Sequence, residues 1–235
     1  MGSDALGLEF AEHRGAAARG PAPLQRSAFI RANTKLLAPP LVPEIKLHLA
    51  EESLPIWQRT EDELGQTNVP PPYWAFAWAG GQALARYVLD RPGLVTGKTV
   101  LDLGAGSGLC AIAARLAGAA SALAADIDPL ALAAVRLNAA ANAVSVDTAA
   151  ADLLASAPGP FDAVLLGDLF YERGLAGRVL DFAAAAARNG ALVLIGDPQR
   201  SYFPKGLFKL AAEYEVPVTR ELEDALIKRT AVWRL

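Results

Sequence analysis

The stretch TVLDLGAGSG at residues 99–108 constrains the fold of this chain more than any other feature. An apolar run breaks there into closely spaced glycines, and the helical pattern of residues 109–116 follows at once, which is typical of a buried strand that turns sharply into a helix. Glycines let a ligand approach the backbone, and the free N–H groups at a helix start attract an anionic group. We therefore predict a strand–helix unit of a parallel sheet that carries a nucleotide-type cradle.

A carboxylate stands at the end of the next apolar run, where residues 120–125 lead into Asp126. In parallel sheets that bind nucleotides, an acidic residue at the end of the second strand accepts hydrogen bonds from ribose hydroxyls. The chain is therefore expected to bind a ligand that contains adenosine.

The glycine spacing separates two classes of such ligands. Gly104, Gly106 and Gly108 are spaced two apart and follow Asp102, whereas a loop that binds the pyrophosphate of a dinucleotide has the form G-x-G-x-x-G. The observed form, D-x-G-x-G-x-G, resembles the loop of class I methyltransferases, and this likeness implies S-adenosylmethionine as the ligand. A tight strand-to-helix turn with no ligand is the alternative.

The rest of the chain alternates strand and helix patterns, as expected for an α/β protein with a parallel sheet. In the front part, residues 29–37 have a helical pattern and residues 44–49 form a short amphipathic segment, with prolines between them and again at 70–72. We expect strands at 99–103, 121–126, 144–146, 161–167 and 191–196, and helices at 73–90, 109–116, 130–140, 174–188 and 208–214. Residues 217–221 and 227–235 alternate like two further strands, the last of which would close the sheet.

These patterns divide the chain into an N-terminal extension, residues 1–70, with a flexible start and then substrate-facing helices, and a catalytic domain, residues 71–235. Ligands bind at the carboxyl ends of the strands in such sheets. This rule places residues 104–108, Asp126, Asp152 and residues 167–171 on one rim.

Composition narrows the function. The formal net charge of −3 argues against a general nucleic-acid binder, and no apolar run is long enough to cross a bilayer without an interrupting charge or proline. The single cysteine, Cys110, is expected to be a packed core thiol, and His13 and His48 lack partners at metal-binding spacing, so we expect no metal. The first 26 residues mix acidic and basic side chains without an apolar region, which favours a bacterial cytoplasm. We expect a monomer.

Several motifs together resemble the electron transfer flavoprotein beta-subunit lysine methyltransferases, a family of seven-β-strand protein methyltransferases. They are LVPEIKL at 41–47, PYWAFAWAGGQALARYVLD at 72–90, the glycine loop at 97–108, DIDP at 126–129, GDLFY at 167–171 and LIGDP at 194–198. The resemblance covers residues 40–200 in order. It implies a Rossmann-like seven-stranded sheet with helices on both faces, and methyl transfer from S-adenosyl-L-methionine to a protein lysine, with S-adenosyl-L-homocysteine as product. The implied substrate is the beta subunit of electron transfer flavoprotein.

The same resemblance assigns the cofactor site. Gly104, Ala105 and Gly106 would pass close to the methionine part of the cofactor, with Gly167 at a neighbouring strand end. Asp126 would bind the ribose, and Ile127 would lie against the adenine. Asp152 fits the adenine amino group, although a solvated loop or a helix-capping carboxylate is an equal alternative. Trp78 would line the cofactor pocket and Trp74 the substrate side, unless both belong with Phe76 to a core stripe.

The family's Asp-x-x-Tyr motif corresponds to Asp168 and Tyr171, which we predict to be catalytic. A lysine must arrive neutral to accept a methyl group, and a carboxylate raises the pKa of a nearby amine. Asp168 is therefore expected to dock and aim the incoming ammonium rather than act as a strong base; its alternative is a helix N-cap. Tyr171 would face the cation with its ring or orient the nitrogen through its hydroxyl, and Phe170 would contact the substrate.

Other functions remain open at this point. The acceptor could be another protein, such as a ribosomal protein, or a small molecule. A nicotinamide-dependent oxidoreductase would need a pyrophosphate-type loop, which is absent from the motif. A non-catalytic adaptor is disfavoured by the intact Asp168 and Tyr171.

Overall fold

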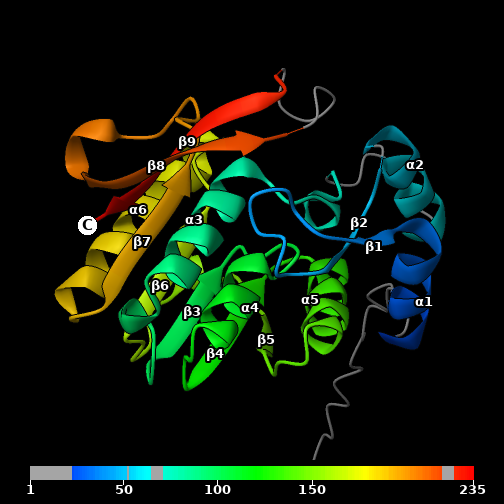
Figure 1. Cartoon of the computed structure of the whole chain (residues 1–235), viewed down its shortest axis with the longest axis horizontal. Coiled ribbons are helices and arrows are strands. Elements are labelled where there is room, and N and C mark those ends of the chain that lie inside the picture. The colour runs from blue at the N-terminus through cyan, green and yellow to red at the C-terminus, as the bar shows by residue number, and fades with distance from the viewer. Residues whose placement is uncertain (1–22, 52, 65–70, 219–224) are drawn as a thin grey trace, which may run out of the picture.

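A computed structural model describes residues 23–51, 53–64, 71–218 and 225–235. Its centre is a seven-stranded sheet in the order β5-β4-β3-β6-β7-β9-β8 (Figure 1). The first five strands of this order are parallel, and β9 runs antiparallel to both of its neighbours. The strands are β3 (Thr99–Leu103), β4 (Ser121–Asp126), β5 (Asp147–Ala150), β6 (Ala163–Gly167), β7 (Leu192–Asp197), β8 (Lys209–Pro217) and β9 (Ile227–Arg234). The predicted fold class is confirmed.

Alternating side chains of the central strands enter two different cores. Val100 packs into one hydrophobic cluster with helices α3 (Ala79–Asp90) and α4 (Leu109–Leu116). Leu101, the next residue, packs into a second cluster with α6 (Arg173–Arg188) on the opposite face. This period of two is what a strand buried on both faces requires. The expected placement of helices on both faces is therefore correct.

The sheet order reverses between β3 and β6. Chain connections from β3 lead one way, through α4 to β4, while β6 lies on the other side of β3 (Figure 1). The loops after these two strands diverge and leave a crevice at their carboxyl ends, where ligands bind in doubly wound sheets.

The N-terminal segment covers helix α5 (Pro129–Ala141). It contains α1 (Pro23–Asn33), the hairpin of β1 (Lys35–Leu37) and β2 (Leu47–Leu49), and α2 (Ser53–Leu64). Ile30 and Ile56 share a buried cluster with Leu130 of α5, and the His48 amide donates to the Asn138 side chain at 2.7 Å. The predicted boundary between residues 70 and 71 adjoins positions outside the described residues, and it stays a prediction.

One expectation about this segment needs correction. The helix predicted at 29–37 ends at Asn33, whereas the short amphipathic segment at 44–49 leads into strand β2, where Leu47 and Leu49 are buried. The Asn33 and Thr34 side chains bond back to the carbonyl oxygens of Phe29 and Ile30, which ends the helix and frees residues 35–37 to pair with 47–49.

The single helix predicted at 73–90 is also divided. Residues Tyr73–Ala75 form a 3-10 turn, η1, and α3 begins only at Ala79, because the backbone of Trp78 is extended. The aromatic residues between these two elements therefore lie on an irregular segment rather than along one helix face.

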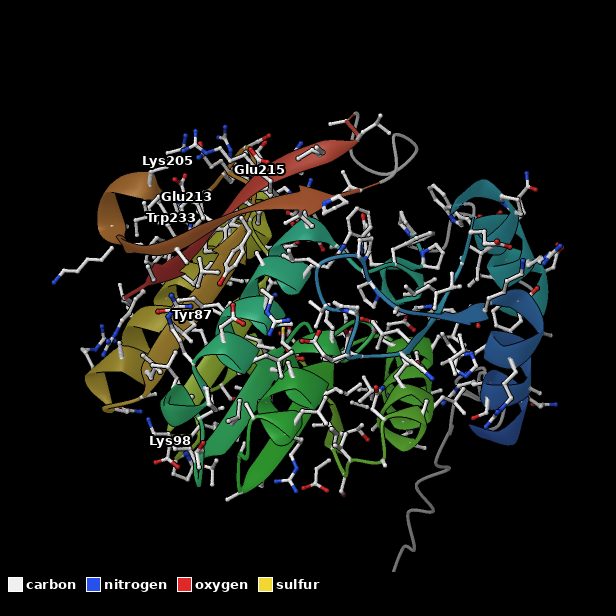
Figure 2. The ribbon with its side chains drawn as sticks, in the orientation of Figure 1. Tyr87, Lys98, Lys205, Glu213, Glu215 and Trp233 are labelled. Atoms are coloured by element: carbon white, nitrogen blue, oxygen red, sulfur yellow. The ribbon has the colours of Figure 1, made fainter. Side chains whose placement is uncertain are left out.

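The C-terminal part differs most from expectation. The helix predicted at 208–214 is wrong, because β8 runs from Lys209 to Pro217. Only the last residue of β8 overlaps the strand predicted at 217–221, and residues 219–224 lie outside the described residues. The final strand does not close the sheet, because β9 lies between β7 and β8. Glu213 and Glu215 mark the outer edge formed by β8 (Figure 2). The weak strand predicted at 144–146 lies slightly later, at β5.

Candidate active site

A cavity of about 630 Å³ lies at the carboxyl ends of β3, β4 and β6, where the sheet order reverses. Its walls include most of the residues predicted for the rim, though not Gly108 or Phe170, and several others. They are Thr60, Pro71, Pro72, Tyr73, Trp74, Phe76, Trp78, Gly81, Asp102 through Ser107, Leu109, Cys110, Ala125 through Ala131, Ala151 through Leu154, Gly167, Asp168, Leu169, Tyr171, Leu175, Arg178 and Arg200. Thr60 comes from α2, so the N-terminal segment contributes to the wall.

The glycine loop has a left-handed backbone where the sequence requires it. Gly104 and Gly106 have φ angles of 64° and 51°, values that side chains strongly disfavour. A Cβ at Gly104 would also clash with the Leu169 side chain. A Cβ at Gly106 would meet no clash, since the Trp74 Cα atom would lie 3.8 Å from it. The loop thus presents backbone, rather than side chains, to the cavity.

Asp126 closes the loop from the adjacent strand. Its Oδ2 atom accepts a hydrogen bond from the Gly106 amide at 2.9 Å, and its Oδ1 atom accepts one from the Asp128 amide at 2.9 Å. Each oxygen keeps a further lone pair, so the carboxylate can still accept from ribose hydroxyls. Ile127 is 74% exposed beside it and lines the cavity, in the position predicted for an adenine contact.

Asp102 ties the end of β3 to helix α4. Its Oδ2 atom accepts a hydrogen bond from the Ala111 amide at 2.9 Å. Burial, together with a smaller effect of the nearby charge of Asp126, raises the pKa of Asp102 to about 8. Cys110 is a buried thiol, as expected, and burial raises its pKa.

Asp152 lies where the cavity meets helix α6. It directly precedes the short turn η3 (Leu153–Ala155), but its side chain makes no capping hydrogen bond to that turn. Its Oδ2 atom instead pairs with the Arg178 guanidinium at 2.5 Å. Its predicted contact with the adenine amino group stays a prediction.

The aromatic side chains divide between core and cavity. Trp74 is 1% exposed and packs with Phe29 and Ile30, yet it also lines the cavity, and its indole nitrogen has no hydrogen-bond partner among the described residues. Trp78 is half-buried, and its indole N–H donates to the Tyr73 carbonyl oxygen at 2.9 Å. The two alternatives for Trp74, core and pocket, are therefore both realised.

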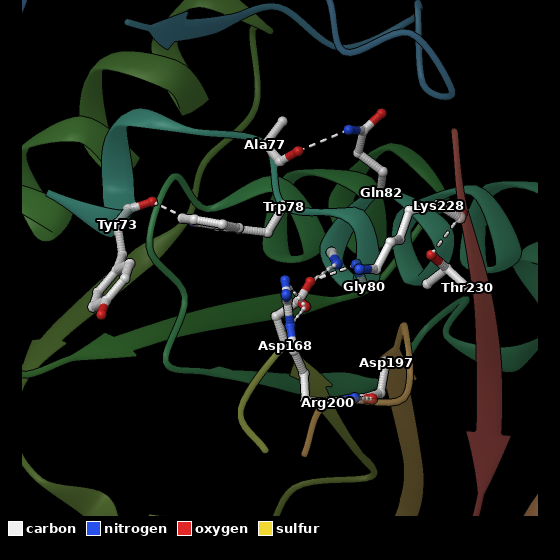
Figure 3. A network of polar contacts seen from close by, with 11 residues as sticks. Tyr73, Ala77, Trp78, Gly80, Gln82, Asp168, Asp197, Arg200, Lys228 and Thr230 are labelled. Carbon is white, nitrogen blue, oxygen red and sulfur yellow. Dashed lines mark hydrogen bonds and ion pairs between the residues drawn. The ribbon is translucent and has the colours of Figure 1, made fainter. Parts of the chain in front are cut away.

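Asp168 is buried at the junction of β6, β7 and α3, with a left-handed backbone at φ 58°. Its Oδ2 atom accepts hydrogen bonds from the Gly80 and Gly81 amides, at the start of α3, and its Oδ1 atom faces the guanidinium of Arg200 (Figure 3). It does not cap the helix that follows it, because Glu172 accepts from the Gly174 amide and caps α6.

Tyr171 and Phe170 have opposite environments. Tyr171 is 45% exposed on the cavity rim, and its ring centroid lies 5.5 Å from that of Tyr73. Phe170 is fully buried against Phe203 and Phe208, at ring-centroid distances of 5.2 and 6.3 Å, and does not line the cavity. The prediction that Phe170 contacts the substrate is therefore wrong.

Gly167 lies where β6 meets the start of α3. A Cβ there would lie 3.2 Å from the Gly81 Cα atom, so a side chain would force the two elements apart. Its position on the cavity wall agrees with its predicted place beside the cofactor.

No group of three or more His, Cys, Asp or Glu side chains within residues 23–51, 53–64, 71–218 and 225–235 is arranged to hold a metal ion. In the same part of the chain, no helix combines the length and apolarity that a bilayer crossing requires.

Known proteins resemble this chain at two levels. The sequence model of the ribosomal protein L11 methyltransferase (PrmA) family matches residues 82–166. The electron transfer flavoprotein beta subunit lysine methyltransferase of Rattus norvegicus is 38% identical over 218 residues, which cover 89% of this chain and 84% of that protein. The Xenopus laevis protein of the same name is 44% identical over 178 residues, 75% of this chain and 71% of that protein.

The chain belongs to the electron transfer flavoprotein beta subunit lysine methyltransferase family. It is therefore a protein-lysine N-methyltransferase with S-adenosylmethionine as its cofactor. Among solved structures, it is similar to the ribosomal protein L11 methylase from Lactobacillus delbrueckii subsp. bulgaricus, with a TM-score of 0.44 and 25% identity over 64% of this chain and 77% of that chain.

The cavity of this lysine methyltransferase fits a cationic cofactor. Asp102 and Asp126 both line the cavity, and burial raises the pKa of each, so a nearby positive charge would favour their charged forms. The sulfonium and ammonium groups of S-adenosylmethionine carry positive charge. The glycine loop, Asp126 and Ile127 are the residues that would hold it.

Arg200 is the main residue of the methyltransferase site that the sequence did not predict. It lines the cavity and comes from the loop after β7. The only available signal was its position just beyond a strand end on the same edge of the sheet as residues 167–171, and that position does not specify which way a side chain points.

Proposed function

We propose that this methyltransferase transfers methyl groups from S-adenosylmethionine to lysine side chains of the beta subunit of electron transfer flavoprotein. The supporting observation is the extent of the likeness to the Rattus norvegicus enzyme, which spans 89% of this chain. It therefore extends well beyond residues 82–166, where the ribosomal protein L11 methyltransferase family matches. Substrate choice depends on the parts outside the cofactor loop, because that loop is shared by methyltransferases of many substrates.

The bound cofactor supplies an electrophilic methyl group on a sulfonium. The protein would need no nucleophile of its own, because the neutral lysine nitrogen of the substrate would be the nucleophile. The protein's contribution is to align the amine and exclude water. Tyr73, Trp78 and Tyr171 form a connected aromatic wall suited to this, with ring-centroid distances of 5.8 Å and 5.5 Å from Tyr73 to its two neighbours.

Aromatic faces also suit the charge of the substrate. A methylated or protonated amine is attracted to a ring face within about 6 Å, and the aliphatic stem of lysine packs well against the same surface. A wall of this kind accepts a lysine that reaches in from a protein surface.

An acceptor panel tests the proposal. The enzyme and S-[methyl-³H]adenosylmethionine are incubated separately with purified electron transfer flavoprotein, ribosomal protein L11 and a protein-free metabolite pool. We expect label in the beta subunit and little in the other two. Label that appears chiefly in ribosomal protein L11 would transfer the assignment to the family matched by residues 82–166, and label confined to metabolites would replace a protein substrate with a small molecule.

We also propose that the enzyme acts as a monomer, because residues of one chain complete the cavity wall. Gel filtration with light scattering at working concentrations checks this. A stable dimer would contradict it.

A further inference from the structure

The loop after β7 brings a positive charge directly against the motif carboxylate. Arg200 donates to the Oδ1 atom of Asp168 through Nε at 2.9 Å and through Nη2 at 2.8 Å. The side chains are only 20% and 9% exposed. Two charge-assisted hydrogen bonds from one guanidinium at this depth make a fixed pair rather than a fluctuating surface contact.

The position of Arg200 is itself held from behind. Its backbone amide donates to the Oδ1 atom of Asp197 at 2.7 Å, and Asp197 is fully buried. The guanidinium also lies over the ring of Trp78, 5.7 Å from the centroid. Figure 3 shows the three residues around Asp168. The turn after β7 therefore delivers the arginine to one place, between the carboxylate and the aromatic wall.

Both oxygens of Asp168 are engaged in this arrangement. One faces the amides at the start of α3 and the other faces Arg200. The pair is neutral overall, and an incoming ammonium would have to compete with a guanidinium already in place. This geometry does not favour the expected role of Asp168 as a docking site for the ammonium.

We propose that Arg200 is a positioning residue that neutralises Asp168 beside the cavity, so that the target lysine is held as a free amine. The inference rests on the proposed lysine methyltransferase activity. An unpaired carboxylate within a few ångströms of the amine would stabilise the ammonium, which has no lone pair to attack the methyl group. Arg200 removes that stabilisation and still keeps Asp168 in place to order the start of α3.

Several other ionisable groups face the same cavity. They are Asp102 after β3, Asp126 and Asp128 after β4, Asp152 near η3, Tyr73 on η1, Tyr171 after β6, Cys110 on α4 and Arg178 on α6, with Asp197 behind Arg200. Substituting Arg200 alone alters none of these side chains, but losing its charge should also raise the pKa of Asp197, which burial raises to about 7 and the Arg200 charge lowers. The difference between the wild type and an Arg200 variant therefore reports the loss of this one charge, including its effect on Asp197.

The first measurement is the pH dependence of kcat at saturating flavoprotein and cofactor, because kcat reports ionisations within the enzyme–substrate complex. Arg200→Gln and Arg200→Met remove the charge, and Met retains an apolar stem next to Trp78. Their acid limbs should shift to higher pH by ~1 unit, the low end of the effect of a neighbouring unpaired charge. Arg200→Lys keeps the charge without the bidentate fork, so it should keep the wild-type profile even where its rate is lower.

The matched control is Arg173→Gln. Arg173 is exposed at the start of α6, stacks over Tyr202 at 5.7 Å and does not line the cavity. The substitution removes a positive charge beside Tyr202, in the loop that carries Arg200, and leaves the contacts of Asp168 intact. The pH profile of Arg173→Gln should therefore superimpose on that of the wild type.

The second measurement needs no turnover. Calorimetry compares the binding of S-adenosylmethionine, which carries the sulfonium charge, with that of neutral-sulfur S-adenosylhomocysteine. Without the charge of Arg200 beside it, Asp168 should favour the cation, so the affinity ratio should move toward S-adenosylmethionine by several-fold in Arg200→Gln and Arg200→Met but not in Arg173→Gln.

The outcomes separate the two claims. If the wild type methylates no protein, the proposed function fails, while the affinity ratio still tests the neutralisation. If the wild type methylates its substrate but the folded Arg200 variants keep both its pH profile and its affinity ratio, the arginine is only structural and the inference is overturned.

Discussion

At the scale of single residues, Asp168 joins three elements through one side chain. It accepts from the start of α3, pairs with the loop after β7 and follows the end of β6. Removing one partner of a buried ion pair costs roughly 3–5 kcal/mol, so substitutions here combine a loss of stability with a loss of alignment. The two effects can be separated by measuring cofactor binding and turnover in the same folded preparation.

Asp168→Asn should bind S-adenosylmethionine within a few-fold of the wild type but lose on the order of a hundredfold in rate, because Arg200 loses the carboxylate that it pairs with and the start of α3 loses its charged anchor. Its melting temperature should also fall. Asp126→Ala is the contrast, because the carboxylate at the glycine loop should be needed for binding itself. Calorimetry and initial rates distinguish them; an Asp168→Asn enzyme with near-normal turnover would show that neither the pairing with Arg200 nor the charged anchor of α3 is needed for catalysis.

Tyr171 is expected to act through its ring. The ring lies 5.5 Å from that of Tyr73, and no hydrogen bond joins its hydroxyl to another described residue. Tyr171→Phe should therefore retain activity within a few-fold, while Tyr171→Ala should lose most of it. A large rate loss in the Phe variant, measured at saturating cofactor, would instead assign the orienting role to the hydroxyl.

Asp102 should make stability depend on pH. Its pKa rises from 3.8 to about 8 on burial, so the folded state keeps a proton that the unfolded chain releases. Stability should therefore fall as the pH rises from about 4 to about 8. Asp102→Asn, which keeps an oxygen for the Ala111 amide, should flatten this decline in urea unfolding at pH 5.5 and pH 8; equal slopes in both proteins would show that Asp102 titrates normally.

At the scale of elements, the strand-to-helix unit from β3 to α4 carries the cofactor loop. Gly106 lines the cavity, so a large side chain there should occupy the space of the cofactor, and its φ of 51° disfavours any side chain. Gly106→Arg should abolish S-adenosylmethionine binding. Gly97→Arg is the matched control, since Gly97 has a φ of 73°, open space around it and no place in the cavity wall. Tight binding by the Gly106 variant in calorimetry would place the cofactor elsewhere.

The elements that could be predicted from sequence are those fixed by local pattern. The bounds of β3, α4 and β4 were predicted to the residue, since apolar periodicity, glycines and a terminal aspartate coincide there. Strand β8 was mistaken for a helix because KLAAEYEVP contains good helix formers; pairing with β9 over most of its length overrides that preference.

The same distinction applies to the site. Gly104, Gly106 and Asp126 were found because one short loop and one strand end contain them. Arg200 was not, because its pairing with Asp168 joins the ends of two strands and depends on the register of the folded sheet. Phe170 was misassigned because the backbone after Asp168 is irregular, which turns neighbouring side chains to opposite sides.

At the scale of the whole molecule, strand order brings distant segments together. The N-terminal segment packs on α5 (Figure 1). The reversal between β3 and β6 opens the crevice beside it, and Thr60 of α2 lines the wall of the cavity there. The cofactor side is thus built by the central sheet, while part of the opposite wall comes from residues before the sheet begins. This division is what a methyltransferase needs to combine a general cofactor loop with a particular protein acceptor.

Intact-mass spectrometry of the flavoprotein beta subunit tests the central claim most directly. Purified electron transfer flavoprotein is incubated with S-adenosylmethionine and either the wild-type enzyme or Asp126→Ala. The methylated lysines of the flavoprotein are then located by peptide sequencing. We predict methyl-sized mass increments on lysines of the beta subunit with the wild type and almost none with the variant. An unmodified beta subunit, under conditions in which the same enzyme fully methylates another acceptor, would contradict the account.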